Sequence, residues 1–442
     1  LLPLNTKNKS AIKVLIVTYY WPPSGGAGVQ RCLKFVKHLP EFGIEPTVVT
    51  VKEDEASYPV IDNSLQQDVP DNVRVIRTST TEPFEYYKKL TGKKEIPFGG
   101  FANDKNESFT QKIFKFLRGN LFIPDPRVGW NRHALKAIKK LLKEEQFDAV
   151  ITSSPPHSTQ LIGLKLKKKF PDLKWIADMR DPWTDIYYYN ELNHTALAKK
   201  LDASYEKDVI QHADAMMVVS DDMKRMFLNK AVTISPDKIQ VVPNGFDEAD
   251  FVYPSAPSKD EFIITYTGTI TEVYNIEAFL KALATVRQQN PQIKYKLRFV
   301  GKIAQQVLRQ IQQAGLEPVT EIVPYVPHEE SIQYMMQSTM LLMAIPDVPN
   351  NFGIVTGKLF EYLASNKPII CIGPIHSDVD AIIDECGAGR VFHYAAYDVM
   401  VDHLMQMSQS WKINPNLDLP FINYNHYSRR ALTEKLAKLI KE

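Results

Sequence analysis

Residues 12–31 read IKVLIVTYYWPPSGGAGVQR, and this stretch decides the fold. Its first six residues form an apolar, largely β-branched run, which is typical of a strand buried on both faces. A turn rich in aromatic residues, proline and glycine follows, and residues 29–39 then show the apolar spacing of an amphipathic helix. A strand, a glycine-containing turn and a helix in this order predict the start of a doubly wound parallel sheet.

The same alternation of apolar strand and helix continues along the chain and predicts a second sheet. In the first half, we expect strands at 12–17, 47–51, 73–77, 149–153, 175–177, 215–219 and 239–243. In the second half, we expect them at 262–267, 296–300, 321–324, 340–344, 369–371 and 389–392. The fold class is therefore α/β, with two Rossmann-like, doubly wound parallel-sheet domains.

A chain of 442 residues is longer than one hydrophobic core normally supports, so two domains are the natural division. We expect an N-terminal domain at 1–248 and a proline- and serine-rich linker at 249–260. A C-terminal domain at 261–424 follows. Residues 425–442 have helical apolar spacing with no strand after them, so this helix needs a surface to pack on.

Composition narrows the class of protein. Hydrophobic residues make up 44% of the chain and charged residues 24%, as in ordinary globular proteins. The net charge of +2 gives no overall attraction to nucleic acid. The three cysteines, Cys32, Cys371 and Cys386, form no metal-binding pattern and are typical of a reducing compartment. No apolar stretch approaches the ~18 residues of a membrane span, so we expect a cytoplasmic protein.

One segment, residues 84–118, fits neither sheet. It interleaves aromatic residues with lysines, a mixture that suits the interface of a membrane carrying anionic lipid. The competing interpretation is a surface insertion whose aromatic rings pack against the domain, and composition alone favours neither.

Two segments of the first half place polar residues where predicted strands end. Gly25 and Gly26 lie between a strand and a helix, where backbone N–H groups can face an anion; alternatively they only permit a tight turn. His157 follows another strand in SSPPHSTQ, at the sheet edge where parallel α/β folds bind ligands. A single histidine is more often structural, so His157 depends on its neighbours for a functional interpretation.

Those neighbours come from IADMRDPW, residues 176–183, which follows the next predicted strand. Asp178, Arg180 and Asp181 concentrate charge at the end of that strand, ahead of a proline. Buried charges need partners, so the run is either an ion-paired scaffold or a site that grips a polar ligand, and both can hold at once.

In the second half, two predicted strands end in a glycine followed by a polar residue, Gly268-Thr269 and Gly301-Lys302. The stretch NNFGIVTGKLFEYLASNKPIIC, residues 350–371, then starts a helix at Thr356-Gly357. Helix N–H groups with Lys358 can bind a pyrophosphate, and Glu361 one turn later can accept hydrogen bonds from ribose hydroxyls. This combination predicts a nucleoside diphosphate site; the alternative is an ordinary exposed Lys/Glu pair.

Taken together, the motifs resemble the retaining GT-B glycosyltransferases of family 4, especially the branch that acts in bacterial surface-polysaccharide assembly. The resemblance covers nearly the whole chain. It rests on KVLIVTYYWPPSGGAG, SSPPHST, DMRDPW, VVPNGFD, TYTGTI, FVGK and TGKLFEYLASNKPII. It implies two domains facing across a cleft, with the acceptor on the N-terminal domain and the donor nucleotide on the C-terminal one. It also implies that the last helix crosses back to the first domain.

The resemblance also assigns roles to residues. The expected catalytic residues are His157, Lys358, Asp181 and Arg180, with His157 beside the transferred sugar. The expected donor-binding residues are Gly25, Gly26, Gly268, Thr269, Lys302, Thr356, Gly357, Lys358 and Glu361. We expect no cofactor besides the UDP- or GDP-linked donor, and no metal, because no DxD pair is placed to hold one.

Two departures from the family pattern bear on activity. Many members have a glutamate eight residues before the position of Glu361, where this chain has Gly353, and Asn350 or Asn351 is a candidate substitute. Many also have an Arg and a Lys after the glycine equivalent to Gly268, and residues 269–275 contain neither. Lys358, Lys302 or Arg180 would then supply the positive charge.

The implied activity is transfer of a sugar, with retention of configuration, to a glycan or polyprenyl-linked acceptor. Residues 84–118 would bring the enzyme to the inner face of the cytoplasmic membrane. A sugar-nucleotide epimerase or hydrolase, and a non-catalytic nucleotide-sugar-binding scaffold, are the competing possibilities.

Overall fold

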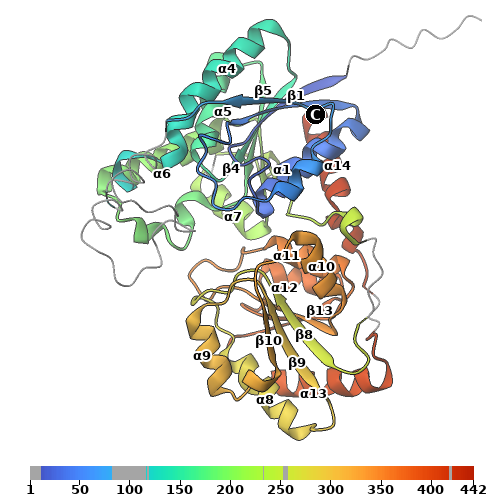
Figure 1. Cartoon of the computed structure of the whole chain (residues 1–442). Coiled ribbons are helices and arrows are strands. Elements are labelled where there is room, and N and C mark those ends of the chain that lie inside the picture. The colour runs from blue at the N-terminus through green and yellow to red at the C-terminus, as the bar shows by residue number, and fades with distance from the viewer. Residues whose placement is uncertain (1–10, 82–115, 117–118, 232, 252–256, 418–420) are drawn as a thin grey trace, which may run out of the picture. The chain divides into compact units, whose positions relative to one another are not determined.

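The computed structural model describes residues 11–81, 116, 119–231, 233–251, 257–417 and 421–442. Contacts divide the chain into two units, each with its own parallel sheet and core. The first unit holds Leu1–Val219, Met223–Val242 and Leu432–Glu442, and the second holds Ser220–Asp222 and Pro243–Ala431. Each unit is described by itself below (Figure 1).

The first unit contains a seven-stranded sheet in the order β3-β2-β1-β4-β5-β6-β7, and each strand pairs in parallel with its neighbours. Its strands are β1 (Ile12–Val17), β2 (Ile44–Val51), β3 (Arg74–Thr78), β4 (Ala149–Ser154), β5 (Lys174–Met179), β6 (Ala215–Val218) and β7 (Ile239–Val241). The helices of this part of the chain are α1 (Ala27–His38), α4 (Asn131–Glu144), α5 (Ser158–Lys169), α6 (Ala196–His212) and α7 (Asp221–Lys230).

Alternate residues of β1 face two separate cores, as the period of a strand requires. Leu15 and Val17 pack with residues of α4, α5 and α6 on one face of the sheet. Val14 and Ile16 pack with α1 and the last helix of the chain on the other face. Burial on both faces explains why this strand has an uninterrupted apolar sequence.

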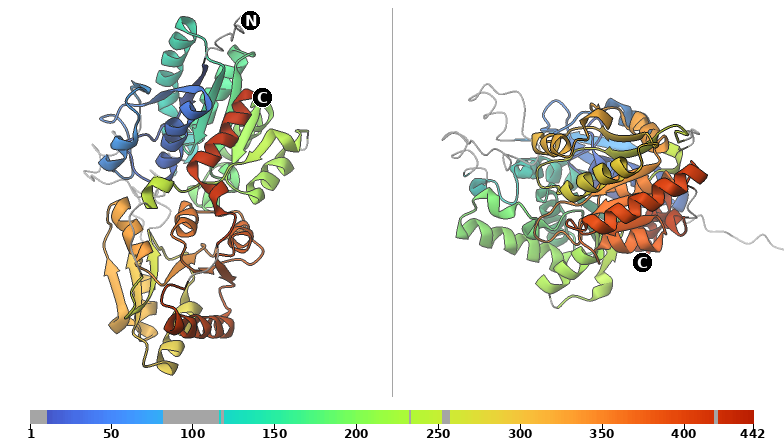
Figure 2. Two further views of the ribbon diagram at one scale, coloured as in Figure 1. Left: turned by 90° about the vertical axis from the view of Figure 1, so that its right-hand side faces the viewer. Right: turned by 90° about the horizontal axis from the view of Figure 1, so that it is seen from below.

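The last helix, α14 (Arg429–Lys441), completes the first unit although the second unit precedes it in the chain. Leu432 and Leu436 are buried in the same core as α1. Lys174 on β5 donates a hydrogen bond to the Leu439 carbonyl at 2.6 Å. Figure 2 shows this red helix lying beside the blue and green elements of the first unit.

The second unit contains a six-stranded parallel sheet in the order β10-β9-β8-β11-β12-β13. Its strands are β8 (Phe262–Thr267), β9 (Tyr295–Val300), β10 (Thr320–Val323), β11 (Met340–Ala344), β12 (Ile369–Ile372) and β13 (Gly389–Phe392). Its helices are α8 (Glu277–Gln289), α9 (Gln305–Gln313), α10 (His328–Met336), α11 (Gly357–Ala364), α12 (Asp378–Glu385) and α13 (Tyr397–Ile413).

Both faces of this second sheet are also covered. One core joins α8, α9 and α13 to the sheet, and the other joins α10, α11 and α12 to it. Leu342 and Ala344 of β11 belong to the first of these cores, and Leu341 and Met343 belong to the second. The prediction of two doubly wound parallel sheets is therefore confirmed.

Element boundaries differ from the sequence-based expectation by a few residues. Strand β2 begins at Ile44 rather than at 47, because residues 44–46 also pair with β1. The chain leaves the first unit after Val242, earlier than the expected boundary at 248. Phe246, which precedes the expected boundary, already belongs to the second unit, since it packs in a core of that unit and its backbone pairs with Ser428.

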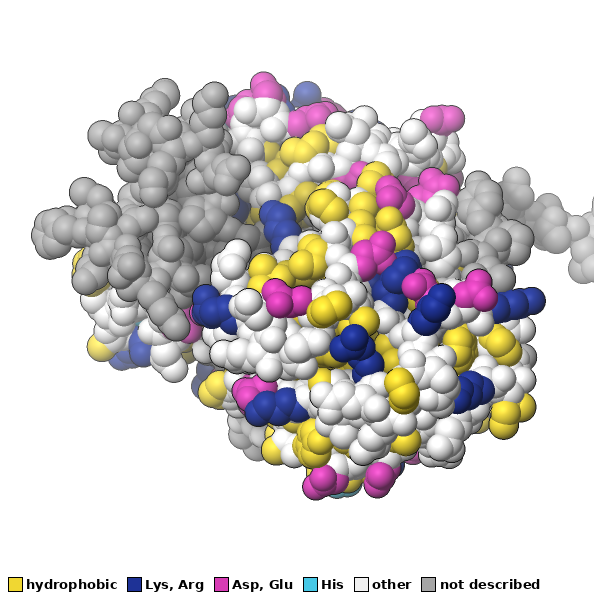
Figure 3. All heavy atoms as spheres, turned by 60° about the horizontal axis from the view of Figure 1, so that its bottom comes forward, with side chains coloured by type: hydrophobic (Ala, Val, Ile, Leu, Met, Phe, Trp, Pro, Cys, Tyr) yellow, Lys and Arg dark blue, Asp and Glu magenta, His cyan; other side chains and the backbone are white. Residues whose placement is uncertain are grey.

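Several expectations fall on residues outside the description. Residues 84–118 lie outside it except for residue 116, and so does much of the expected linker at 249–260. In the described part of the chain, no helix combines the length and apolar character of a membrane span. On the face of the molecule drawn in Figure 3, basic and acidic side chains are interspersed rather than gathered by sign.

The packing of α14 gives a stability prediction. Leu436→Ala should lower the free energy of unfolding by about 2–5 kcal/mol, because it leaves a cavity at a fully buried position. Leu197→Ala is the matched control, since Leu197 lies on α6 with 78% of its surface exposed and should change stability by less than about 0.5 kcal/mol. Thermal and denaturant unfolding measure both. Equal effects of the two substitutions would contradict the packing of α14 described above.

Candidate functional site

Strand order reverses direction between β1 and β4 in the first sheet and between β8 and β11 in the second. At such a point the loops leaving the two neighbouring strands diverge, which leaves a crevice at the carboxyl ends of the strands. The candidate residues therefore gather at two sheet edges, one in each unit.

In the first unit, a buried ion pair occupies this edge. Nη2 of Arg31 lies 2.8 Å from Oδ1 of Asp178, and Nε contacts both carboxylate oxygens at 3.1 Å. Ser153 donates to the same carboxylate at 2.7 Å. Arg31 and Asp178 are almost completely buried and paired with each other. Asp178 is therefore part of an ion-paired scaffold rather than a residue that grips a ligand.

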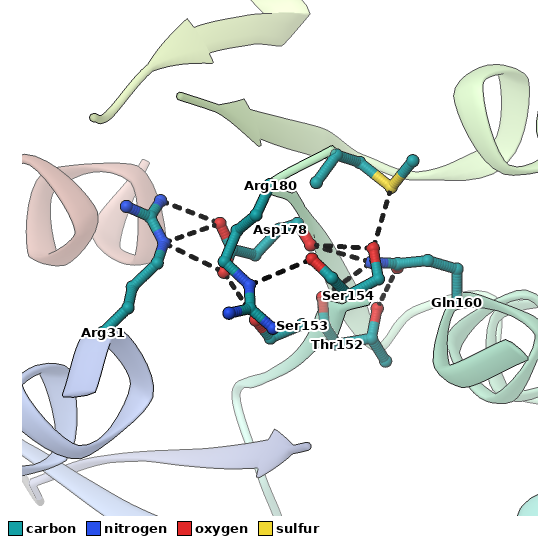
Figure 4. A network of polar contacts seen from close by, with 8 residues as sticks. Arg31, Thr152, Ser153, Ser154, Gln160, Asp178 and Arg180 are labelled. Atoms are coloured by element: carbon teal, nitrogen blue, oxygen red, sulfur yellow. Dashed lines mark hydrogen bonds and ion pairs between the residues drawn. The ribbon is translucent and has the colours of Figure 1, made fainter. Parts of the chain in front are cut away.

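Next to this pair, Gln160 of α5 joins the ends of β4 and β5 (Figure 4). Its amide nitrogen donates to the carbonyls of Thr152 and Asp178 and to the hydroxyl of Ser154. Its oxygen accepts a hydrogen bond from the Thr152 hydroxyl at 2.5 Å. Buried hydrogen bonds at the ends of β4 and β5 therefore fix the backbone that leads to His157 and Arg180.

Arg180 is held by backbone rather than by a carboxylate. Its guanidinium donates to the carbonyls of Ser154 and Pro155 at 3.0 and 2.9 Å. The group lies so close to the first turn of α1 that a Cβ at Gly28 would overlap it. A cation is thus fixed against a helix N-terminus, where free N–H groups already favour an anion.

His157 precedes α5, and its ring stacks on that of Trp183 at 4.8 Å with an angle of 14°. Burial, together with the charges of Arg180 and Lys230, lowers the pKa of His157 to about 3. The ring is therefore neutral near pH 7. Its Nδ1 is buried without a hydrogen-bond partner, which favours the tautomer with the proton on Nε2.

Asp181, Gly25 and Gly26 complete the predicted residues of this unit. Burial raises the pKa of Asp181, and the Arg180 charge partly opposes the shift. Gly25 donates its N–H to the Val60 carbonyl at 2.9 Å. Gly26 is the N-cap residue of α1 at φ 103°, a conformation that favours glycine. The structure therefore places the two glycines at the start of α1, as the sequence pattern predicts.

Sequence reasoning missed a second polar cluster in the first unit. Trp183 donates its indole N–H to Asp202 at 2.8 Å, and the Tyr189 hydroxyl donates to the same carboxylate. Burial raises the pKa of Asp202 to about 6. Glu206 on the same helix pairs with Lys230 at 2.8 Å. The spacing of Asp202 and Glu206, four residues apart on α6, is the sequence signal that could have indicated this cluster. Exposed helices show the same spacing of acidic residues, so the signal is not specific.

In the second unit, Lys358 of α11 reaches the end of β8. Its Nζ donates to the Tyr266 hydroxyl and to the Thr267 carbonyl, both at 2.8 Å. It also lies 4.0 Å from the centre of the Tyr266 ring. Burial lowers the pKa of Lys358 to about 7, although the Glu361 charge acts in the opposite direction. A bound anion would therefore meet a lysine close to its titration point.

The start of α11 lies beside that lysine. Thr356 is the N-cap residue but makes no capping hydrogen bond, and its hydroxyl is buried without a partner. Gly357 is the first residue of the helix. Tyr362, one turn on, accepts the N–H of Thr267 at 3.0 Å and so anchors β8 to the helix. Free helix N–H groups, an unsatisfied hydroxyl and Lys358 together match an anionic group.

Glu361 is held by a residue that the sequence did not single out. Its Oε1 lies 2.9 Å from Nε2 of His328, the first residue of α10. The Nδ1 atom on the other side of that ring lies 4.0 Å from the carboxylate of Asp250. The structure thus places Glu361 in a chain of three side chains rather than in an isolated Lys/Glu pair.

Gly268, Thr269 and Lys302 lie in the loops after β8 and β9. Gly268 has φ 94°, and a Cβ there would lie 3.3 Å from Nζ of Lys358, so glycine leaves room for the lysine. The Thr269 carbonyl accepts a hydrogen bond from Tyr266. Lys302 is exposed. All three residues lie with Lys358 at the carboxyl edge of the sheet, and the side chain of Lys302 is exposed to solvent there.

The position of the missing family glutamate is tightly packed. A Cβ at Gly353 would lie 2.9 Å from both the Ser220 hydroxyl and the Cβ of Asp222. Asn351, a candidate substitute, donates its amide to the Pro346 carbonyl and to the Tyr394 hydroxyl, so its N–H groups are already used. Asn350 lies at φ 57° and stays a predicted substitute.

Comparison with known proteins identifies the family. Residues 101–250 match the model described as Glycosyltransferase Family 4, and residues 249–418 match the model described as Glycosyl transferases group 1. A curated relative, the probable glycosyltransferase WbjE of Pseudomonas aeruginosa, is 22% identical over 331 residues, covering 69% of this chain and 80% of the relative.

Solved structures share the fold along nearly the whole chain. The sucrose-phosphate synthase of Thermosynechococcus elongatus has a TM-score of 0.60 at 15% identity, covering 97% of this chain and 98% of that one. Anabaena Alr3699/HepE in complex with UDP-glucose has a TM-score of 0.59 at 12% identity, with 97% and 99% covered. With its two Rossmann-like units and its matches to both domain models, the chain belongs to the GT-B glycosyltransferases that combine a family 4 N-terminal domain with a group 1 C-terminal domain.

Proposed function

We propose that this glycosyltransferase takes its sugar from a UDP- or GDP-linked donor and transfers it, with retention of configuration, to a glycan or polyprenyl-linked acceptor in surface-polysaccharide synthesis. The observation that carries the proposal is Lys358, held between Tyr266 and the Thr267 carbonyl beside the start of α11. The complex of Anabaena HepE with UDP-glucose supports the choice of donor class.

The second unit holds the donor in this proposal. The diphosphate would take hydrogen bonds from the N–H groups that open α11 and from Thr356, with Lys358 supplying the charge. Glu361 would accept the ribose hydroxyls. Lys358 makes no hydrogen bond to a carboxylate among the described residues, so a diphosphate would be the first anion to accept a hydrogen bond from it. The leaving group would thereby be stabilised as the glycosidic bond breaks.

The first unit holds the acceptor. Arg180 and the N-terminus of α1, which begins after Gly26, form an electropositive edge suited to a phosphate-bearing acceptor, while the Gly25 N–H is already used by the Val60 carbonyl. His157 is neutral, so we assign it a hydrogen bond from Nε2–H to a sugar hydroxyl rather than proton transfer. Asp181 is a candidate acceptor of a proton or hydrogen bond, because burial raises its pKa.

Removing the lysine charge tests the donor site. Lys358→Met keeps the length of the side chain and should weaken binding of a UDP- or GDP-sugar at least about tenfold, which is the cost of one charge-assisted hydrogen bond. Binding of the nucleoside without phosphates should change little. Lys281→Met, at a lysine paired with Glu277 on α8, is the control. Isothermal titration measures the affinity of both variants and of the wild type for the nucleotide sugar and for the nucleoside. Unchanged affinity of Lys358→Met for the nucleotide sugar rules out this donor assignment.

The lowered pKa of Lys358 predicts a pH dependence of donor binding. Bound diphosphate favours the protonated lysine, so the complex has the higher pKa, and affinity should be greatest below about pH 7. Above that value affinity should fall by up to about tenfold per pH unit until the pKa of the complex is reached. A nucleotide sugar is the suitable ligand, since its diphosphate does not titrate near neutrality. Lys358→Met should flatten the profile; a wild-type profile that is already flat contradicts the assignment.

His157 gives a third test. His157→Ala should lower the rate at which nucleoside diphosphate is released from the donor by about 10²-fold. His157→Gln should retain part of this rate, because its amide can still donate a hydrogen bond. With a pKa near 3, His157 should add no step to the pH–rate profile between pH 5 and 8. His212→Gln, at an exposed position of the same unit, is the control. A histidine step near pH 6.5 that disappears in His157→Gln excludes the neutral role.

The tightly packed Gly353 favours one competing function. Without the family glutamate, the chain would bind a nucleotide sugar but not turn it over, as a scaffold would. A labelled donor with a polyprenyl-linked acceptor separates these cases. Transfer of label supports the enzyme, release of free sugar supports a hydrolase, and binding without turnover supports the scaffold.

A further inference from the structure

Three side chains that are distant in the sequence form a chain at the second sheet edge. Asp250 comes from the 3-10 turn η7 (Glu248–Phe251), His328 from the start of α10 and Glu361 from α11. The imidazole lies between the two carboxylates, 2.9 Å from Glu361 and 4.0 Å from Asp250. All three side chains are largely buried, with exposed fractions of 19–26%.

The hydrogen bond from His328 uses only one oxygen of Glu361. Oε1 contacts Nε2 of the imidazole, while Oε2 has no hydrogen-bond partner in the part of the chain that the structure describes. A glutamate side chain has three rotatable bonds, and ordering them on ligand binding costs conformational entropy. A glutamate that is already held loses little more when its ligand arrives.

We infer that His328 is a positioning residue that orients Glu361, with Asp250 behind it, so that the second carboxylate oxygen faces the ribose hydroxyls of the donor. The inference rests on the proposed donor site and adds to it a determinant of ribose recognition. A carboxylate fixed in this way discriminates against a 2′-deoxyribose, because the missing hydroxyl leaves an oriented acceptor without its donor.

If His328 instead competed with the ligand for Glu361, the His328→Ala substitution would change nucleotide affinity in the opposite direction. If His328 competed with ribose for Glu361, removing the imidazole would strengthen nucleotide binding. If it orients Glu361, removing it weakens binding and reduces the preference for ribose over deoxyribose. Affinity and preference together therefore identify the role.

The experiment measures binding of UDP, GDP and their 2′-deoxy forms to the full chain by isothermal titration. With the tighter of the two bases, His328→Ala should weaken ribonucleotide binding about tenfold, as expected for loss of a hydrogen bond to a charged group. The ratio of ribo- to deoxyribonucleotide affinity should fall towards one. His328→Gln should recover much of both, because its amide nitrogen can donate to Glu361.

Two further variants complete the set. His426→Ala is the matched control, since His426 pairs at 3.6 Å with Glu385, the last residue of α12 in the same unit, and should leave affinity and preference unchanged. Glu361→Ala should abolish the ribose preference. Because the preference is a ratio measured on one preparation, partial misfolding of a variant does not alter it.

The possible failures are distinguishable. Equal or tighter binding by His328→Ala, or an unchanged ribose preference, overturns the positioning role while leaving the donor site intact if Glu361→Ala still loses the preference. Wild-type protein that binds none of the four nucleotides, or Glu361→Ala that behaves as wild type, overturns the donor assignment itself.

Discussion

Each of the two sheets is covered by helices on both faces, so a polar side chain on a strand is buried and needs a partner within the protein. This constraint organises the molecule. Apolar residues open β4, β5 and β8 after at most one polar residue, and polar residues concentrate towards the carboxyl ends of these strands and in the loops after them. Asp178 shows the rule at its limit, since its buried carboxylate is tolerated only because Arg31 and Ser153 satisfy it. The candidate site is a consequence of how the sheets are buried.

The charged residues at the two edges differ in what they leave available. Arg31 and Asp178 neutralise each other and hold α1 against β5. Arg180 and Lys358 are instead held by carbonyl oxygens and, for Lys358, by an aromatic ring, which use some of their N–H donors but do not cancel their charge. The first arrangement maintains the frame, and the second maintains a positive potential where an anion can bind. Burial is the main reason that the pKa of His157 is low and its ring neutral, and the charge of Arg180 adds to this effect.

The sequence was sufficient to predict every strand of the two described sheets and the parallel character of both, because β-branched runs between helical segments have few alternative arrangements. It also placed Lys358 and Thr356 at a helix start. It did not reveal the partners of Glu361 and Trp183, because His328 and Asp202 lie on other elements and have no distinctive local pattern. Nor did it show whether Asp178 is paired, since Arg31 is far away in the chain and the pair forms only when α1 packs on the sheet. Local chemistry could be predicted from spacing, and long-range pairing could not.

The position of α14 determines how the chain can be divided. The N-terminal unit takes one of its covering helices from residues that follow the second unit in the sequence. A fragment that stops at Val242 would therefore expose the apolar stripe normally covered by Leu432, Leu436 and Ile440. Such a stripe promotes self-association. A gene fragment encoding the first half alone should therefore aggregate on expression unless residues 429–442 are supplied with it, for example through a short fused linker. During synthesis, the first unit can likewise complete its core only after α14 has emerged from the ribosome.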